Sequence, residues 1–138
     1  MRGLEPQGRG FILPLMAHDN FLRINMLCDV MLDTLHWSGG NTTVDALACG
    51  LPVITLPGEF MRGRQSYGML KCMGLDELIA KDQDDYIEKA IRIGTDSAWR
   101  KQVVRQIIVN SNKIFEMEAS LRQMESFYHI EFKVQCGN

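Results

Sequence analysis

Short runs of residues typical of β-strands alternate with helical patterns, and this alternation limits the possible folds more than any other feature of the sequence. The strand-like runs cover residues 10–13, 29–32, 52–56 and 77–80. The helical patterns cover residues 19–28, 43–49, 63–73, 84–93, 96–109 and 114–129. Because parallel strands need crossover helices, this order predicts an α/β fold with a partial Rossmann-like parallel sheet of about four strands and a helical C-terminal tail.

Glycines mark several of the predicted boundaries. Gly50 and Gly74 lie where a helix end favours a residue tolerant of positive φ, and Gly94 and Thr95 predict the end of one helix and the N-cap of the next. No linker, repeat or low-complexity tract divides the 138 residues, which indicates a single domain. A doubly wound nucleotide-binding lobe commonly has about six strands, so we expect this chain to be a truncated lobe.

Composition and charge argue against several classes of protein. Fifteen Lys and Arg against 17 Asp and Glu are interspersed and give a net charge of −2, which favours neither nucleic acid nor anionic lipid as a partner. No run approaches the ~20 apolar residues of a membrane-spanning helix, and residues 1–10 lack the apolar core of a signal peptide. The four cysteines form no C-x-x-C pair, so no zinc site is expected. A cytoplasmic protein is therefore expected.

The most informative segment, residues 29–47, is predicted to run from a strand through a glycine-bearing loop into a helix. Val44, Leu47, Ala48 and Leu51 form one apolar stripe at helical spacing. The start of such a helix presents unpaired N–H donors and about half a positive charge, so it is suited to a phosphate. The residues that we expect around this phosphate are Gly39, Gly40, Asn41, Thr42 and Thr43.

Asp45 lies in the first turn of the predicted helix, where it would repel a phosphate that it faced. It is better suited to accept hydrogen bonds from neutral hydroxyls, such as those of a ribose. The same segment also fits a second interpretation, because Thr42 and Asp45 have the spacing of a capping box. Nucleotide binding and capping are compatible, and the spacing leaves both open.

The loop after the next predicted strand leaves the sheet at the same carboxyl edge, where doubly wound folds bind ligands. Arg62 or Arg64 can reach a phosphate from there, and Glu59 a sugar hydroxyl. The alternative is that these are two solvated arginines and a glutamate at the start of a helix.

Residues 32–96 resemble the C-terminal catalytic region of the O-linked N-acetylglucosamine transferases, especially the SPINDLY-like bacterial proteins. The motifs occur in the order of that family: a strand, a G-G-N-T-T-x-x-A-L turn, an L-P-V-I-T-L-P-G-E strand and loop, and a later G-T-D helix junction. The resemblance extends over about residues 11–128. It implies the donor-binding lobe of a two-lobed GT-B enzyme that transfers a sugar from a UDP-sugar to Ser or Thr of a protein acceptor, with no metal or other cofactor.

The resemblance also implies roles for individual residues. Thr42 and Thr43 would contact the pyrophosphate and Asp45 the ribose, while Asn41 stands where the animal enzymes have histidine. An upstream loop would hold the nucleoside through the backbone of Met16, through His18 at the ribose and through Phe21 against the base. The arginine that contacts uracil in the animal enzymes aligns with Ile24.

His36 and Trp37 precede the glycines and are candidates for the sugar pocket, although core packing would also explain Trp37. No catalytic residue is assigned to this chain, because in the family the proton-handling residues lie in the other lobe. The lysine with which the family binds the pyrophosphate lies in an earlier segment of the same lobe, which is not among these 138 residues. The chain alone is therefore expected to be inactive without its N-terminal lobe and the tetratricopeptide repeats that usually precede it.

The predicted tail helix carries an apolar stripe from Ile114 to Tyr128, which also includes Met117, Leu121 and Met124. The stripe fits either an interface, including self-association, or packing onto the core of the same domain. Two other functions remain open at this point. One is a non-catalytic interaction module with a vestigial nucleotide site, and the other is a nucleotide-sugar epimerase lobe, for which the sequence offers no recognisable acid and base.

Overall fold

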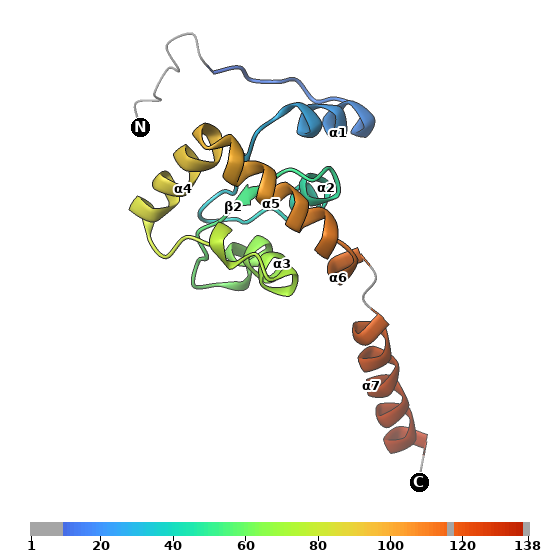
Figure 1. Ribbon diagram of the computed structural model, residues 1–138. Helices are drawn as coiled ribbons and strands as arrows, with labels where there is room; N and C mark the ends of the chain where they lie inside the picture. The colour runs from blue at the N-terminus through green and yellow to red at the C-terminus, as the bar shows by residue number, and fades with distance from the viewer. Residues whose placement is uncertain (1–9, 116–117, 137–138) are drawn as a thin grey trace.

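The computed structural model describes residues 10–115 and 118–136 and shows helices arranged around a very small sheet (Figure 1). The elements in chain order are α1 (His18–Leu27), β1 (Met31–Leu32), α2 (Asn41–Ala48), β2 (Val53–Ile54), the 3-10 turn η1 (Met61–Gly63), α3 (Gln65–Met73), the 3-10 turn η2 (Asp76–Leu78), α4 (Gln83–Thr95), α5 (Ser97–Asn110), α6 (Asn112–Phe115) and α7 (Glu118–Cys136). The α/β class is confirmed, with far more helix than strand.

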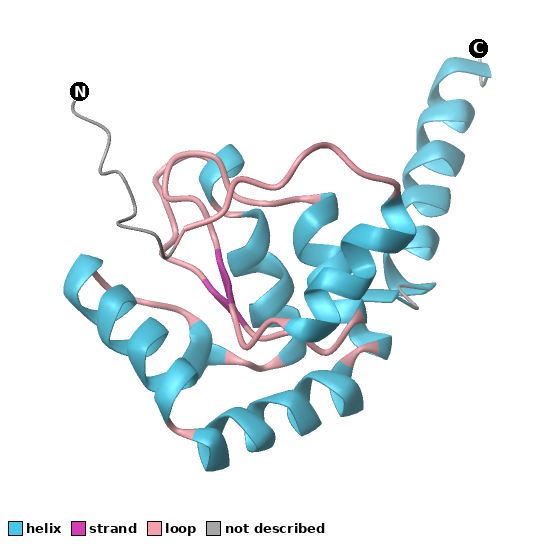
Figure 2. Ribbon diagram, turned by 90° about the horizontal axis from the view of Figure 1, so that it is seen from above, coloured by secondary structure: helices cyan, strands magenta, loops and turns pink. Residues whose placement is uncertain are grey.

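The sheet consists of β1 and β2, which run parallel with Met31 opposite Val53 and Leu32 opposite Ile54. Figure 2 shows these strands in the middle of the surrounding helices. One further parallel bridge joins Thr55 to Ile79. Within the described residues, the prediction of about four strands is therefore wrong, although the two continuously apolar runs do form the parallel pair.

The other two predicted strands do not form. One has no described segment to pair with, and the other has too few extended residues. Residues 10–13 form no strand, and Phe11, Ile12 and Leu13 are exposed by 86%, 101% and 56%. No described segment offers them a hydrogen-bonding edge, and a strand is stable only within a sheet. Residues 77–80 begin inside the 3-10 turn η2, so only Ile79 pairs with the end of β2.

The helices lie close to their predicted positions, and their ends follow local chemistry. Gly50 and Gly74 both have a φ of 74°, as expected for residues that end helices. The predicted junction at Gly94 and Thr95 is displaced, because both residues belong to α4 and Asp96 caps α5. The Asp96 carboxylate accepts hydrogen bonds from the first-turn N–H groups of α5, which a threonine placed one residue earlier does not reach.

The hydrophobic core lies between the sheet and the helices α2, α3, α4 and α5. The side chains that are less than 2% exposed come from every one of these elements, which explains how so small a sheet can organise the domain. They include Leu47, Val53, Ile54, Leu70, Met73, Ile93, Val103 and Ile107. Outside this core, α1 packs against α2, and α3 packs against α6.

The tail divides into two parts that behave differently. Ile114 of α6 packs against the core, so it is not available for the predicted interface. By contrast, α7 points away from the rest of the protein in both views (Figures 1 and 2). Its side chains Leu121, Met124 and Tyr128 are exposed by 64%, 59% and 63%, and Met117 lies outside the described residues. This part of the stripe does not fold onto the core.

The contrast between two isoleucines of α4 tests the position of the core. Ile93 is fully buried and Ile91 is 60% exposed on the same helix. We expect Ile93→Ala to lower the free energy of unfolding by about 2–5 kcal/mol, because the truncation removes buried surface and leaves a cavity. The control Ile91→Ala should change it by less than about 0.5 kcal/mol. Urea unfolding followed by circular dichroism measures both, and equal effects would contradict this packing.

Candidate functional site

A buried carboxylate organises the glycine-rich turn. Asp33 follows β1 directly and is 4% exposed. Its Oδ2 lies 2.7 Å from both Ser38 Oγ and Thr55 Oγ1, and its Oδ1 accepts a hydrogen bond of 2.8 Å from the Gly39 N–H. Because a buried carboxylate needs donors around it, these contacts hold the loop between residues 33 and 39 against the end of β2.

Helix α3 closes the turn from the other side. The Ser66 N–H donates to Ser38 Oγ at 2.9 Å, and Ser66 Oγ lies 2.8 Å from Thr43 Oγ1. Ser66 and Thr43 are both fully buried. The Thr43 hydroxyl is therefore engaged inside the protein, whereas Thr42, one residue earlier, is exposed.

Gly39 is needed to accommodate the protein's own side chains. A Cβ on Gly39 would lie 2.7 Å or less from the hydroxyls of Thr42 and Thr43. A Cβ on Gly40 would lie 2.6 Å from Gln65 Oε1, the end of a flexible side chain that can move aside. The close packing of the turn thus explains Gly39 before any ligand is considered, whereas packing does not explain Gly40.

The first turn of α2 leaves backbone donors free. Gly40 is the N-cap, no side chain caps the helix, and the N–H groups of both Thr43 and Val44 bond to the Gly40 carbonyl. Within the described part of the chain, the N–H groups of Asn41 and Thr42 make no hydrogen bond. The capping box considered from the sequence does not form, so these donors remain open to an acceptor.

A cavity of about 280 Å³ lies beside this turn at the carboxyl end of β1. Three of its lining residues were singled out from the sequence, namely Phe21, Gly39 and Thr42. Asn25 and Asp33 line it as well and were not predicted. The cavity therefore joins α1, β1 and the start of α2. We call it the nucleotide pocket below, after the ligand that the sequence leads us to expect there.

Helix α1 contacts α2 through side chains that line neither the turn nor this cavity. His18 Nε2 lies 3.0 Å from Asp45 Oδ2, so the two residues expected at a ribose contact each other. The Asp45 side chain is 23% exposed, which means that its carboxylate is not turned into the core. One turn further on, Cys49 Sγ lies 3.6 Å from the Leu22 carbonyl oxygen. Burial raises the pKa of this thiol, and the Asp45 carboxylate raises it further.

A second cavity, of about 220 Å³, brings together three other predicted residues. His36, Glu59 and Arg62 line it, together with Phe60. The Arg62 guanidinium lies 4.8 Å from the centre of the Phe60 ring. Since His36 follows Thr34 of the nucleotide pocket by two residues, the same loop supplies side chains to both cavities.

Several other predicted residues line neither cavity, namely Met16, His18, Trp37, Gly40, Asn41, Thr43, Asp45 and Arg64. Arg64 donates to the Gly58 carbonyl at 3.0 Å and lies 4.4 Å from the centre of the Tyr67 ring, which indicates a structural role. Met16 is half-buried ahead of α1, and neither cavity includes it. Trp37 is 68% exposed, so core packing does not account for it.

Tyr86 of α4 is hydrogen-bonded to the backbone at the start of the turn. Its hydroxyl donates to the Asp33 carbonyl oxygen at 2.8 Å. Burial raises the pKa of Tyr86, and the negative charge of Asp33 adds to this, so the hydroxyl keeps its proton well above neutral pH. The sequence contains one signal that could have pointed to Asp33. This acidic residue directly follows an apolar strand and precedes the glycines.

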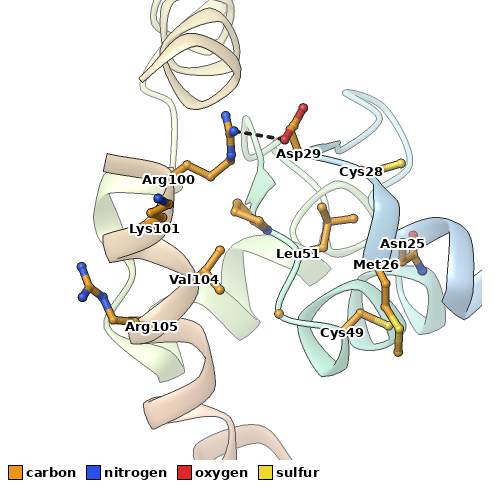
Figure 3. A pocket seen from close by; sticks show the side chains of 12 residues that line it. Asn25, Met26, Cys28, Asp29, Cys49, Leu51, Arg100, Lys101, Val104 and Arg105 are labelled. Carbon is orange, nitrogen blue, oxygen red and sulfur yellow. Dashed lines mark ion pairs between the residues drawn. The ribbon is translucent and has the colours of Figure 1, made fainter. Parts of the chain in front are cut away.

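A further cavity, of about 450 Å³, lies at the opposite edge of the sheet (Figure 3). Asp29 and Pro52, which precede the two strands, line it, and Arg100 of α5 forms an ion pair with Asp29 at 3.2 Å. Ligands of open parallel sheets bind at the carboxyl ends of the strands, so this cavity is not the candidate site.

Two other features are absent from the described part of the chain. Within residues 10–115 and 118–136, no group of three or more His, Cys, Asp or Glu side chains is arranged to hold a metal ion. Among the helices of those same ranges, none combines the length and the apolar character that crossing a membrane requires.

Comparison with known protein families matches residues 2–124 to glycosyl transferase family 41. The chain belongs to this family. A probable UDP-N-acetylglucosamine--peptide N-acetylglucosaminyltransferase SPINDLY from Solanum lycopersicum is 30% identical over 138 residues, which cover 97% of this chain and 15% of that protein. The UDP-N-acetylglucosamine--peptide N-acetylglucosaminyltransferase of Caenorhabditis elegans is 31% identical over 126 residues, which cover 90% of this chain and 11% of that protein.

The fold agrees with that assignment. A solved structure of a Thermobaculum terrenum O-GlcNAc transferase mutant matches with a TM-score of 0.80 and 30% identity, over 91% of this chain and 24% of that one. The resemblance inferred from the motifs is thus confirmed at the level of the family. The chain spans only a small part of the length of each of these proteins.

The role of Asp33 in holding the turn can be tested by its removal. Asp33→Ala leaves the Ser38 and Thr55 hydroxyls and the Gly39 N–H without their buried acceptor, so we expect a loss of at least about 1–3 kcal/mol in the free energy of unfolding. The control Asp84→Ala, at an exposed site near the start of α4, should cost about 1 kcal/mol or less. Thermal and urea unfolding measure both, and equal losses would contradict an organising role for Asp33.

Proposed function

We propose that this chain forms the nucleotide-sugar-binding portion of a protein O-glycosyltransferase that uses a donor of the UDP-N-acetylglucosamine type. The names of the relatives describe enzymes that transfer N-acetylglucosamine to peptides. The observation that carries the proposal for this chain is the open start of α2, with its two free backbone N–H groups beside the nucleotide pocket.

The diphosphate is placed at the first turn of α2. The free N–H groups of Asn41 and Thr42 and the exposed Thr42 hydroxyl donate to its oxygens, and the positive end of the helix dipole favours its charge. Thr43 acts indirectly in this proposal, because its hydroxyl is bound to Ser66 and fixes the turn. No metal is needed to hold a diphosphate in this way.

The nucleoside occupies the nucleotide pocket and the sugar occupies the second cavity in this proposal. Phe21 packs against the base in the nucleotide pocket. The His18–Asp45 pair, which lies three residues from Phe21 on α1 and three from Thr42 on α2, holds the ribose hydroxyls. His36, Glu59 and Arg62 line the second cavity, where a carboxylate and an imidazole suit the hydroxyl groups of a sugar. The acceptor protein and the proton-handling groups are assigned to parts of the enzyme outside this chain.

Calorimetry with UDP tests the proposal directly. We expect Thr42→Ala to weaken UDP binding by about two- to tenfold, since one hydrogen bond is lost. Asp45→Asn should weaken it by about tenfold or more, because it removes a charged acceptor of ribose hydroxyls. Thr95→Ala and Asp84→Asn make the same chemical changes at exposed positions of α4 and serve as controls. UDP binding that is equally strong in all five proteins would rule out the assigned site.

The exposed apolar face of α7 favours a second role, self-association with another copy of the chain. Leu121, Met124, Phe127 and Tyr128 lie on this face and are each exposed by more than half. Apolar surface of this extent gains stability when it is removed from water, and a second copy of the same helix offers a matching face. This role is compatible with nucleotide binding, because no described residue of α7 lines either cavity.

Sedimentation velocity over a range of concentrations tests this second role. Met124→Glu places a charge on the apolar face, so we expect it to abolish a concentration-dependent increase in the sedimentation coefficient. Gln123→Glu adds the same charge to the neighbouring exposed residue and should leave the increase in place. A wild-type chain that sediments as a monomer at every concentration would exclude self-association through α7.

A further inference from the structure

Asn25 carries a buried amide whose hydrogen-bonding capacity is unused. It lies in the last part of α1 and is 7% exposed. Its Nδ2 atom is buried without any hydrogen-bond partner in the part of the chain that the structure describes. Buried side-chain amides are normally paired, because an unpaired donor has lost its water without compensation. An asparagine in this position therefore calls for a partner that residues 10–115 and 118–136 do not supply.

The location of Asn25 indicates what that partner is. Asn25 follows Phe21 by one helical turn, so both side chains lie on one face of α1 and both line the nucleotide pocket. Asn25 also borders the cavity of Figure 3, where it lies on the side opposite Arg105. In the nucleotide pocket, an aromatic ring for stacking and an amide for hydrogen bonding are thus placed one turn apart. These are the two features with which proteins bind a flat nucleobase.

We propose that Asn25 binds the edge of the donor's nucleobase and is the residue of this pocket that recognises its polar groups. This inference rests on the proposed function. Uracil offers a carbonyl acceptor beside a ring N–H donor, and the asparagine amide offers the complementary donor and acceptor. The Nδ2 atom has almost no exposed surface and no partner among the described residues, so in this proposal the amide turns toward the pocket when the nucleotide binds and is then paired. The hydroxyl and backbone groups at the start of α2 bind only the phosphates and are not selective for the base.

Asn25→Leu separates base binding from phosphate binding, because it keeps the approximate volume and removes the polar groups. We expect UDP to bind about tenfold more weakly, as for the loss of a buried hydrogen bond, while the affinity for inorganic pyrophosphate stays within twofold. Thermal stability should not fall, since the substitution removes an unpaired buried amide. The control Asn20→Leu changes an exposed asparagine of the same helix and should leave both affinities unchanged. Ligand-observed NMR competition measures both ligands.

A second variant keeps the proposal testable if Asn25→Leu does not fold. Asn25→Asp preserves the shape but replaces N–H donors with an acceptor, which suits the amino group of cytosine and not the carbonyl of uracil. We expect the preference for UDP over CDP to fall by about tenfold or to invert. A purely structural role for Asn25 would leave this preference unchanged.

The outcomes distinguish this inference from the function on which it rests. UDP binding that depends on Thr42 and Asp45 but is insensitive to Asn25→Leu, with the UDP and CDP preference also unchanged in Asn25→Asp, would overturn the role of Asn25 alone. Equal weakening of UDP and pyrophosphate by Asn25→Leu would overturn it as well, because a general distortion of the pocket would then explain the loss. A wild-type chain that binds no UDP would overturn both proposals.

Discussion

The structure of the candidate site depends on one buried charge. The Asp33 carboxylate lies at the end of β1 and is surrounded by donors from the turn and from β2. Removing a carboxylate from water is costly, so it persists in the interior only where several donors are fixed around it. Ser38, Gly39 and Thr55 must therefore keep their positions together. This requirement joins the glycine-rich turn to the strand pair in one arrangement.

The same turn is closed toward the interior and open toward solvent. On the inner side, Ser66 bonds to Ser38 and Thr43, and Gly39 leaves space for neighbouring side chains. On the outer side, no side chain caps α2, so its first N–H groups stay free. Buried polar groups that are fully paired fix a single local geometry. The rigidity of the inner side thus allows the outer side to present donors in fixed positions without a ligand.

The sequence was sufficient to predict the elements whose positions depend on local chemistry. It was not sufficient to predict which extended segments form strands, because a strand forms only where another segment pairs with it. The apolar runs around Met31 and Val53 form strands because each lies beside the other and under helices. Residues 10–13 have a similar composition but no described neighbour, so β-propensity alone does not make a strand there. The end of α4 was displaced for a different reason, since the choice of Asp96 over Thr95 as the next cap depends on which side chain reaches the free N–H groups.

For the site, the sequence located the turn but could not distinguish neighbouring side chains by their direction. Thr42 and Thr43 have the same chemistry, yet Thr43 faces inward because Ser66, 23 residues later, supplies its partner. Thr43 is distinguished by the partner that it has, whereas Asn25 is distinguished by a partner that is missing among the described residues, and the sequence shows neither. The lack of a partner is a property of the packed structure and not of the residue. In a parallel fold, the contacts that decide which side chain faces the interior come from segments far apart in sequence. The spacing of residues therefore locates the glycine-rich turn, and only the packed structure shows which of its neighbouring side chains are free to bind a ligand.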